Sequence, residues 1–70
     1  MEKSVKITTP FIKLDSLLKF ADLIASGGEG KMVIQDGLVS VNGEVCTQRG
    51  KKIHPGDKVS FNGTEIKVED

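Results

Sequence analysis

Basic side chains concentrate in one short segment of this sequence, a pattern that can bind phosphate groups. Within residues 47–58 a single acid, Asp57, stands against four cations: Arg49, Lys51, Lys52 and Lys58. A local group of cations can contact phosphates without making a whole protein basic, although a charged segment is more usually a solvated surface. Two lysines on predicted helices, Lys19 and Lys31, are further candidates, and Lys31 lies near a helix start, where the helix dipole disfavours a cation.

Three glycines in the first turn of a predicted helix offer a second possible phosphate contact. Ser26 followed three residues later by Glu29 matches a capping box, which predicts that a helix begins near Gly27. A glycine inside a helix costs about 0.5–1 kcal/mol relative to alanine. Close packing against a neighbouring helix would explain Gly27, Gly28 and Gly30, and we favour it. The alternative is that the bare amides of a helix N-terminus approach a phosphate.

Catalytic and metal chemistry have little support in the sequence. The glycine-rich segment lacks the phosphate-loop pattern, which needs glycine at Ala25 and Ser or Thr at Met32. His54 is the only histidine, and no cluster of metal-ligating residues surrounds it. Cys46 is the only cysteine, so it cannot form an internal disulfide and is interpreted as a small buried hydrophobe. We expect no enzymatic activity, cofactor or metal.

The length and composition favour a small binding module. A chain of 70 residues is expected to form one domain, residues 1–70, with a shallow binding surface instead of a deep pocket. Ten Lys and Arg balance ten Asp and Glu, so only a local field could attract nucleic acid. No run of about 20 apolar residues and no secretory signal is present, which predicts a cytoplasmic protein without membrane contact.

Hydrophobic spacing predicts the elements of the first half of the chain. Val5 and Ile7 alternate with polar residues, which indicates a short strand before Pro10. One helical face is predicted from the spacing of Leu14, Leu17, Leu18, Ala21 and Ile24. This helix would meet the second helix at Ala25-Ser26, and the second would end at Gly37.

Turn signals organise the second half as a sheet. Asn62-Gly63 predicts a hairpin with Phe61 opposite Thr64, which turns Val59, Phe61, Ile66 and Val68 to one face. The same pairing at Asn42-Gly43 would turn Val45 to the other face, so we expect a longer loop there. Pro55-Gly56 suits the centre of a type II turn. The predicted fold class is α+β, with two short N-terminal helices packed on a small, mostly antiparallel β-sheet.

The few aromatic residues limit how a nucleic acid could be recognised. The chain has three phenylalanines and no other aromatic residue except His54, and Phe61 is assigned to the core. Stacking of successive single-stranded bases is therefore expected to be weak. Recognition of a structured RNA by its shape and backbone fits the sequence better.

These motifs resemble the S4 RNA-binding domain over most of the chain. The resemblance rests on the Gly-x-Val-x-Val-Asn-Gly string of residues 37–43 followed by Gly56-Asp57. Residues 26–31 and the loop 49–52 are similar to the small stand-alone bacterial proteins of the YbcJ/YaaA type. The resemblance implies an S4-like fold with an αL motif, no catalysis, and binding of ribosomal or other structured RNA through the paired helices and adjoining loop. Many family members carry arginine where Gly27 stands.

The leading hypothesis is a non-catalytic protein that binds structured RNA through a local basic face. The candidate RNA-binding residues are Lys19, Ser26, Gly27, Gly28, Lys31, Arg49, Lys51 and Lys52. A ribosomal subunit or a protein partner are further candidate binding partners. The alternative is a protein-interaction module of the translation or replication machinery, in which the lysines are only solvated surface.

Overall fold

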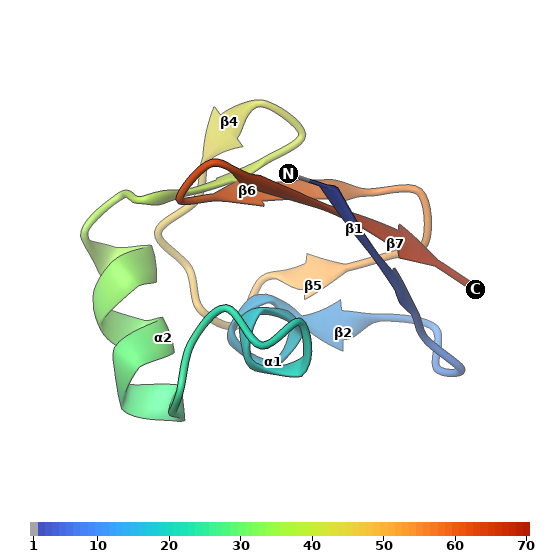
Figure 1. The fold of residues 1–70 in the computed structure, drawn as a ribbon, viewed down its shortest axis with the longest axis horizontal. Coiled ribbons are helices and arrows are strands. Elements are labelled where there is room, and N and C mark those ends of the chain that lie inside the picture. Colours follow the sequence, from blue (N-terminus) through green and yellow to red (C-terminus); the bar gives the residue numbers. More distant parts are fainter. Residues whose placement is uncertain (1) are drawn as a thin grey trace.

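The computed structural model describes residues 2–70, which form two helices and two sheets (Figure 1). The elements follow in the order β1 (Glu2–Lys6), β2 (Ile12–Lys13), α1 (Leu14–Phe20), α2 (Gly27–Gln35), β3 (Val39–Val41), β4 (Glu44–Val45), β5 (Lys52–Ile53), β6 (Lys58–Phe61) and β7 (Thr64–Glu69). The larger sheet has the order β1-β7-β6-β3-β4, and only β1 and β7 pair in parallel. The predicted α+β fold is confirmed, although two strands precede the helices.

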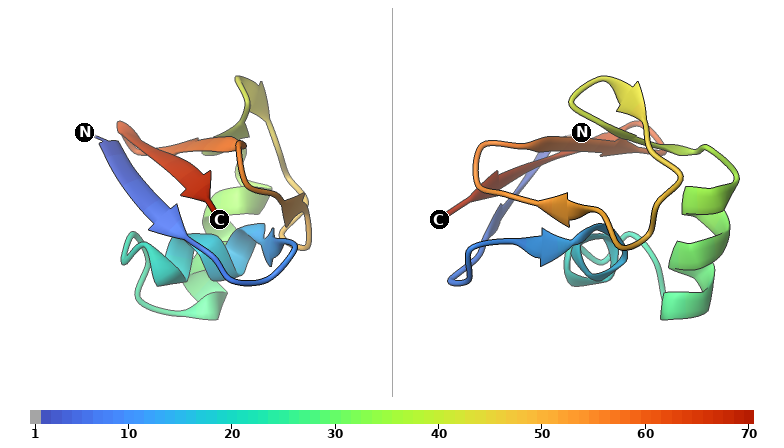
Figure 2. Two further views of the ribbon diagram at one scale, coloured as in Figure 1. Left: turned by 90° about the vertical axis from the view of Figure 1, so that its right-hand side faces the viewer. Right: turned by 180° about the vertical axis from the view of Figure 1, so that it is seen from behind.

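The hydrophobic core lies between one face of the larger sheet and helix α1, with the small β2–β5 sheet beside that helix (Figure 2). Leu14, Leu17 and Leu18 of α1 are fully buried, as the helical spacing predicted. Val59 and Ile66 meet them from the β6–β7 hairpin and are equally buried. Burial of each such side chain contributes about 1.5–3 kcal/mol, so α1 is held by packing despite its length of only two turns.

Helix α1 ends earlier than its hydrophobic spacing predicted. Asp22 has a φ of 63°, in the left-handed region where helices commonly end. The amide of Leu23 donates to the carbonyl of Leu18 (3.0 Å), and the amide of Asp22 to that of Lys19 (3.0 Å). These two bonds form a Schellman motif. Ile24 is buried as predicted, but it reaches the core from a loop.

Helix α2 has the predicted boundaries. The hydroxyl of Ser26 accepts from the amide of Glu29 (3.3 Å), while the Glu29 carboxylate accepts from the amide of Ala25 (2.7 Å). These two reciprocal bonds satisfy the amides of Ala25 and Glu29 at this helix start. At the other end Gly37 adopts a φ of 75°, and the amide of Leu38 donates to the carbonyl of Val33 (3.1 Å).

Of the three predicted turns, two are confirmed and one is corrected. Phe61 pairs with Thr64 as expected, and Gly56 has the positive φ of 96° that a type II turn needs. The prediction of a longer loop after β3 is wrong. Val41 pairs directly with Glu44 across a two-residue turn, which leaves Val45 63% exposed.

The outer face of the larger sheet is polar. Lys58, Ser60, Glu65 and Lys67 alternate with the core residues of β6 and β7 and point away from the helices. The aromatic ring of Phe61 lies on the core side, as predicted, and is half-buried. The described strands therefore present no aromatic platform on this face. Neither helix within residues 2–70 has the length and hydrophobicity needed to span a membrane.

Candidate nucleic-acid interface

The basic loop is anchored to the N-terminus of helix α1 by its backbone. Lys13 is the N-cap residue, and its side chain makes no capping hydrogen bond. Instead, the amide of Leu14 donates to the carbonyl of Lys51 (2.9 Å), and the amide of Asp15 to the carbonyl of Arg49 (3.2 Å). These carbonyls satisfy amides that every helix start leaves free. The side chains of Arg49 and Lys51 remain exposed on a loop fixed in place.

Pairing of β2 with β5 adds a further lysine to this region. Lys13 lies directly opposite Lys52, and both are exposed. We call Lys13, Arg49, Lys51 and Lys52 the basic surface. Lys13 is not among the residues predicted from the sequence, because these two-residue strands lie far apart in the chain and carry no local strand signal. The only signal in the sequence that Lys13 lies at the start of α1 was its position immediately before Leu14, the first core residue of that helix.

The three glycines of helix α2 have different environments. A Cβ at Gly30 would lie 2.6 Å from Ile24 Cδ1, in the loop before α2, and at an ordinary contact distance of 3.7 Å from Asp15 Cβ of α1, so the absence of a side chain at Gly30 lets α2 pack closely against Ile24. At Gly27 nothing lies within 4 Å, and at Gly28 only Ser26 Oγ does, at 3.9 Å. Packing therefore explains Gly30 but neither Gly27 nor Gly28. Within residues 2–70 the amides of these two glycines have no hydrogen-bond acceptor.

The predicted cations fall into three places. Arg49, Lys51 and Lys52 gather at the start of α1. Lys31 is exposed on α2 next to Gly30, which itself contacts Asp15 beside the basic loop. Lys19 is exposed in the last turn of α1, about 8 Å along the helix axis from its start.

None of these five cations forms an ion pair with an acid in the described structure. The ion pairs within residues 2–70 are His54–Asp57 (3.8 Å) and Lys58–Glu65 (3.9 Å), and the first requires a protonated histidine. The cations near α1 are consequently available for an external anion. The hydroxyl of Ser26, in contrast, caps helix α2.

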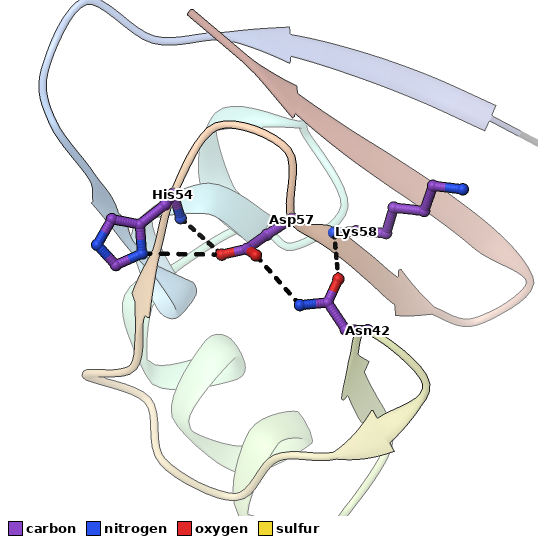
Figure 3. A network of polar contacts seen from close by, with 4 residues as sticks. All are labelled: Asn42, His54, Asp57 and Lys58. Atoms are coloured by element: carbon purple, nitrogen blue, oxygen red, sulfur yellow. Dashed lines mark hydrogen bonds and ion pairs between the residues drawn. The ribbon is translucent and has the colours of Figure 1, made fainter.

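Asn42 and Asp57, two residues of the motif that resembles the S4 domain, form a network of hydrogen bonds (Figure 3). The side chain of Asn42 donates to Asp57 Oδ1 (3.1 Å) and accepts from the amide of Lys58 (3.0 Å). Its own amide donates to the carbonyl of Lys58 (2.7 Å). These bonds hold Asn42 at a positive φ of 52° and fix the tight turn after β3. Asn42 and Asp57 thus join two turns that are distant in the chain.

Asp57 also organises the turn that leads out of β5. The amide of His54 donates to Asp57 Oδ2 (2.8 Å), and this bond is the main reason why the pKa of Asp57 lies below its ordinary value. Partial burial opposes the shift in pKa, whereas the hydrogen bond from Asn42 and the charges of His54 and Lys51 favour it. Asp57 is thus a carboxylate at neutral pH, and Lys51 lies near it.

An open groove of about 670 Å³ runs between the β3–β4 turn and β5. Lys51, Lys52 and His54 line it together with the Asn42–Asp57 pair. Cys46 also lines the groove and is half-buried, not fully buried as predicted, with its thiol 3.7 Å from the carbonyl of Gln48. Across residues 2–70, no group of three or more His, Cys, Asp or Glu side chains could hold a metal ion.

Comparison with known proteins assigns the family. A family model described as "S4 domain" matches residues 5–69, so the chain belongs to the S4 domain family. S4 domains are non-catalytic, and the expectation that this chain is not an enzyme is confirmed by its family.

Individual relatives have similar length and sequence. The "Probable ribosome maturation protein RlbA" of Bacillus subtilis (strain 168) is 40% identical over 63 residues, covering 90% of this chain and 89% of that protein. The "Putative RNA-binding protein YbcJ" of Escherichia coli (strain K12) is 39% identical over 59 residues, covering 84% of each. The solution structure of E. coli YbcJ, described as revealing an αL motif involved in RNA binding, is similar with a TM-score of 0.71 and 35% identity, covering 99% of this chain and 86% of that one. The resemblance to YbcJ-type proteins is confirmed.

Proposed function

We propose that residues 1–70 act as a single S4-like domain that binds structured RNA in the cytoplasm. The contacts would come from the basic surface, from Lys19 and Lys31, and from the N-terminus of α2 at Ser26, Gly27 and Gly28. The observation that carries this proposal is the anchoring of the basic loop on helix α1. It holds exposed cations in place without neutralising them.

The physical argument favours recognition of an RNA backbone. Unpaired cations attract phosphates by a local field even though the net charge of the protein is zero. The polar outer face of the sheet offers no aromatic rings for successive bases. A folded RNA, whose shape and phosphates are fixed, therefore suits this surface better than an extended single strand.

Ribosomal RNA is the class that we propose. The support is the name of the Bacillus subtilis relative, which refers to ribosome maturation, together with the similar length of the two proteins. In this role the domain would bind a folded segment of ribosomal RNA during assembly of a ribosomal subunit. Because the proposed contacts are electrostatic, the affinity is expected to fall as salt is added, with a slope set by the number of phosphates contacted.

A salt titration tests the RNA-binding surface. The probe is a fluorescein-labelled stem–loop taken from ribosomal RNA, and the dissociation constant is measured by anisotropy at several salt concentrations. With four or five phosphate contacts, the logarithm of the affinity should fall against the logarithm of salt with a slope of roughly −3 to −4. The charge-reversal variant Lys51→Glu/Lys52→Glu should lose affinity and flatten this slope by about 1.5.

The matched control reverses two lysines elsewhere on the molecule. Lys6 and Lys67 are exposed on the outer face of the sheet and have no ion pair within residues 2–70, so Lys6→Glu/Lys67→Glu changes the net charge equally. If both double variants lose the same affinity while remaining folded, binding depends on net charge and the proposed surface is wrong.

A protein-interaction role is the second candidate, and the exposed apolar side chains favour it. Among the described residues these are Phe20, Met32, Leu38 and Val45, each more than half exposed. If the stem–loop does not bind at low salt, and a partner from the translation or replication machinery co-purifies after nuclease treatment, this second function replaces the first.

A further inference from the structure

The small β2–β5 sheet has an outer face that combines an aromatic ring with cations. Ile12 and Ile53 pair with each other and turn toward the core, where Ile53 is fully buried. Because successive side chains of a strand alternate between faces, their neighbours point outward. We call these outward residues, Phe11, Lys13, Lys52 and His54, the ribbon face. Strands β2 and β5 lie side by side at the surface of the molecule (Figures 1 and 2).

The side chains of the ribbon face contact one another directly. The ring of Phe11 lies 6.2 Å from the ring of His54, with 52° between the two planes. The ammonium group of Lys52 lies 4.9 Å from the centre of the Phe11 ring. Phe11 is partly exposed and His54 is exposed, and neither belongs to the hydrophobic core. An aromatic pair is thus held at the surface next to a cation.

The two lysines of the ribbon face form no ion pair in the described part of the protein. Lys13 and Lys52 are directly opposite each other, an arrangement that is unfavourable for like charges. Neither forms an ion pair with an acid of residues 2–70. Lys58 and Lys67 are also opposite each other, but Glu65 lies 3.9 Å from Lys58. No such acid pairs with Lys13 or Lys52, so a bound anion would relieve the repulsion between these two lysines.

We propose that the ribbon face binds one unpaired nucleotide of the RNA, with its base against Phe11 and His54 and its phosphate between Lys13 and Lys52. This inference rests on the proposed function, since the nucleotide would flank the stem that the basic surface holds. A base has an aromatic face for stacking and a phosphate for the cations, and it matches both features of the ribbon face. An exposed cation–π contact is weak, so Lys52 can leave the ring when a base arrives.

The position of the ribbon face supports one continuous path for the RNA. Lys52 belongs to both the ribbon face and the basic surface, and Lys52 and His54 line the groove together with Lys51. A nucleotide that leaves a stem could therefore reach the ribbon face without losing contact of its neighbouring phosphates with Arg49 and Lys51. Bases inside a stem are already stacked, so the site would select an unpaired one.

The experiment compares two RNA stem–loops that share one stem and differ only in a single unpaired 3′ nucleotide. The native protein should bind the RNA with the unpaired nucleotide about tenfold more tightly, since stacking of one base has roughly this effect. Phe11→Leu, which keeps an apolar side chain, should lose this preference while its affinity for the plain stem is unchanged. Phe20→Leu is the matched control, because Phe20 is 67% exposed at the far end of α1, and it should keep the preference.

Two further measurements test the binding of an unpaired nucleotide to the ribbon face even if Phe11→Leu does not fold. Fluorescence of 2-aminopurine placed at the unpaired position should be quenched on binding, because stacking on an aromatic ring quenches it. Lys13→Gln, an exposed position, should reduce the preference, and it should flatten the salt slope more with the unpaired nucleotide than with the plain stem–loop. Equal binding of both RNAs by the native protein overturns the inference and leaves the proposed function standing. Absence of binding to either RNA overturns both.

Discussion

Substitution of the three glycines of helix α2 by alanine should separate packing from function. Alanine stabilises a helix by about 0.5–1 kcal/mol relative to glycine. At Gly30 the new Cβ would lie 2.6 Å from Ile24 Cδ1, and Ile24 is itself buried and cannot move freely. Overpacking of a core contact costs about 1–3 kcal/mol. Gly30→Ala should therefore lower the free energy of unfolding by a net amount of about 0.5–2 kcal/mol.

The other two positions should behave in the opposite way. Gly27 and Gly28 have open space around their Cα atoms, so alanine there should leave the protein equally stable or stabilise it by about 0.5 kcal/mol. Urea unfolding followed by circular dichroism measures these changes, and a change of 1 kcal/mol corresponds to a shift in Tm of roughly 4–8 °C in a domain of this size. Equal effects at all three positions would refute the reasoning from packing.

The same variants test the proposed phosphate contact at the start of α2. If the amides of Gly27 and Gly28 approach a phosphate, a methyl group at either Cα should hinder this approach. The double variant Gly27→Ala/Gly28→Ala should then be as stable as the native protein but bind the ribosomal stem–loop less tightly. Unchanged affinity in a folded variant removes these two glycines from the RNA-binding site.

Three further predictions concern the polar contacts that support the site. Ser26→Ala removes the cap of α2 and should lower the free energy of unfolding by about 1 kcal/mol, whereas Ser26→Asp should not. Asn42→Ala removes two side-chain hydrogen bonds at a positive φ and should cost about 2–4 kcal/mol in urea unfolding; a cost near zero would contradict the network of Figure 3. Because the pKa of Asp57 is lowered in the folded protein, its carboxylate stabilises the native state above the unfolded pKa of about 3.9, and this contribution disappears as the pH falls through the lower folded value. Asp57→Asn should therefore flatten the loss of stability in acid, and an unchanged pH profile would contradict this assignment.

Several elements were predictable because their signals are local. The start of α2 depends on hydrogen bonds between residues at most four positions apart, and Ser26 with Glu29 showed them in the sequence. The Asn62-Gly63 hairpin has a two-residue turn, so its register followed from the turn itself. Burial of Leu14, Leu17 and Leu18 followed from helical spacing. The end of α1 did not, since no glycine marks it and a residue other than glycine, such as Asp22, adopts a positive φ in only a few per cent of cases.

The tight turn at Asn42-Gly43 shows where local reasoning failed. The sequence predicted a longer loop because a tight turn exposes Val45. Val45 is exposed in the structure, and the tight turn is stabilised by hydrogen bonds of the Asn42 side chain to Asp57 and Lys58, which lie in a distant part of the chain. These hydrogen bonds form only when the two turns meet in the folded protein.

The sequence by itself determined the fold class, the family and the identity of most candidate cations, because residue type and short-range spacing carry that information. Only the tertiary structure decided how the candidates are grouped. It placed the carbonyls of Arg49 and Lys51 on the start of α1, and it showed that Gly30 packs while Gly27 is open. It also set Lys13 opposite Lys52. Such contacts join residues far apart in the chain, and they depend on burial of the whole core, which no local pattern specifies.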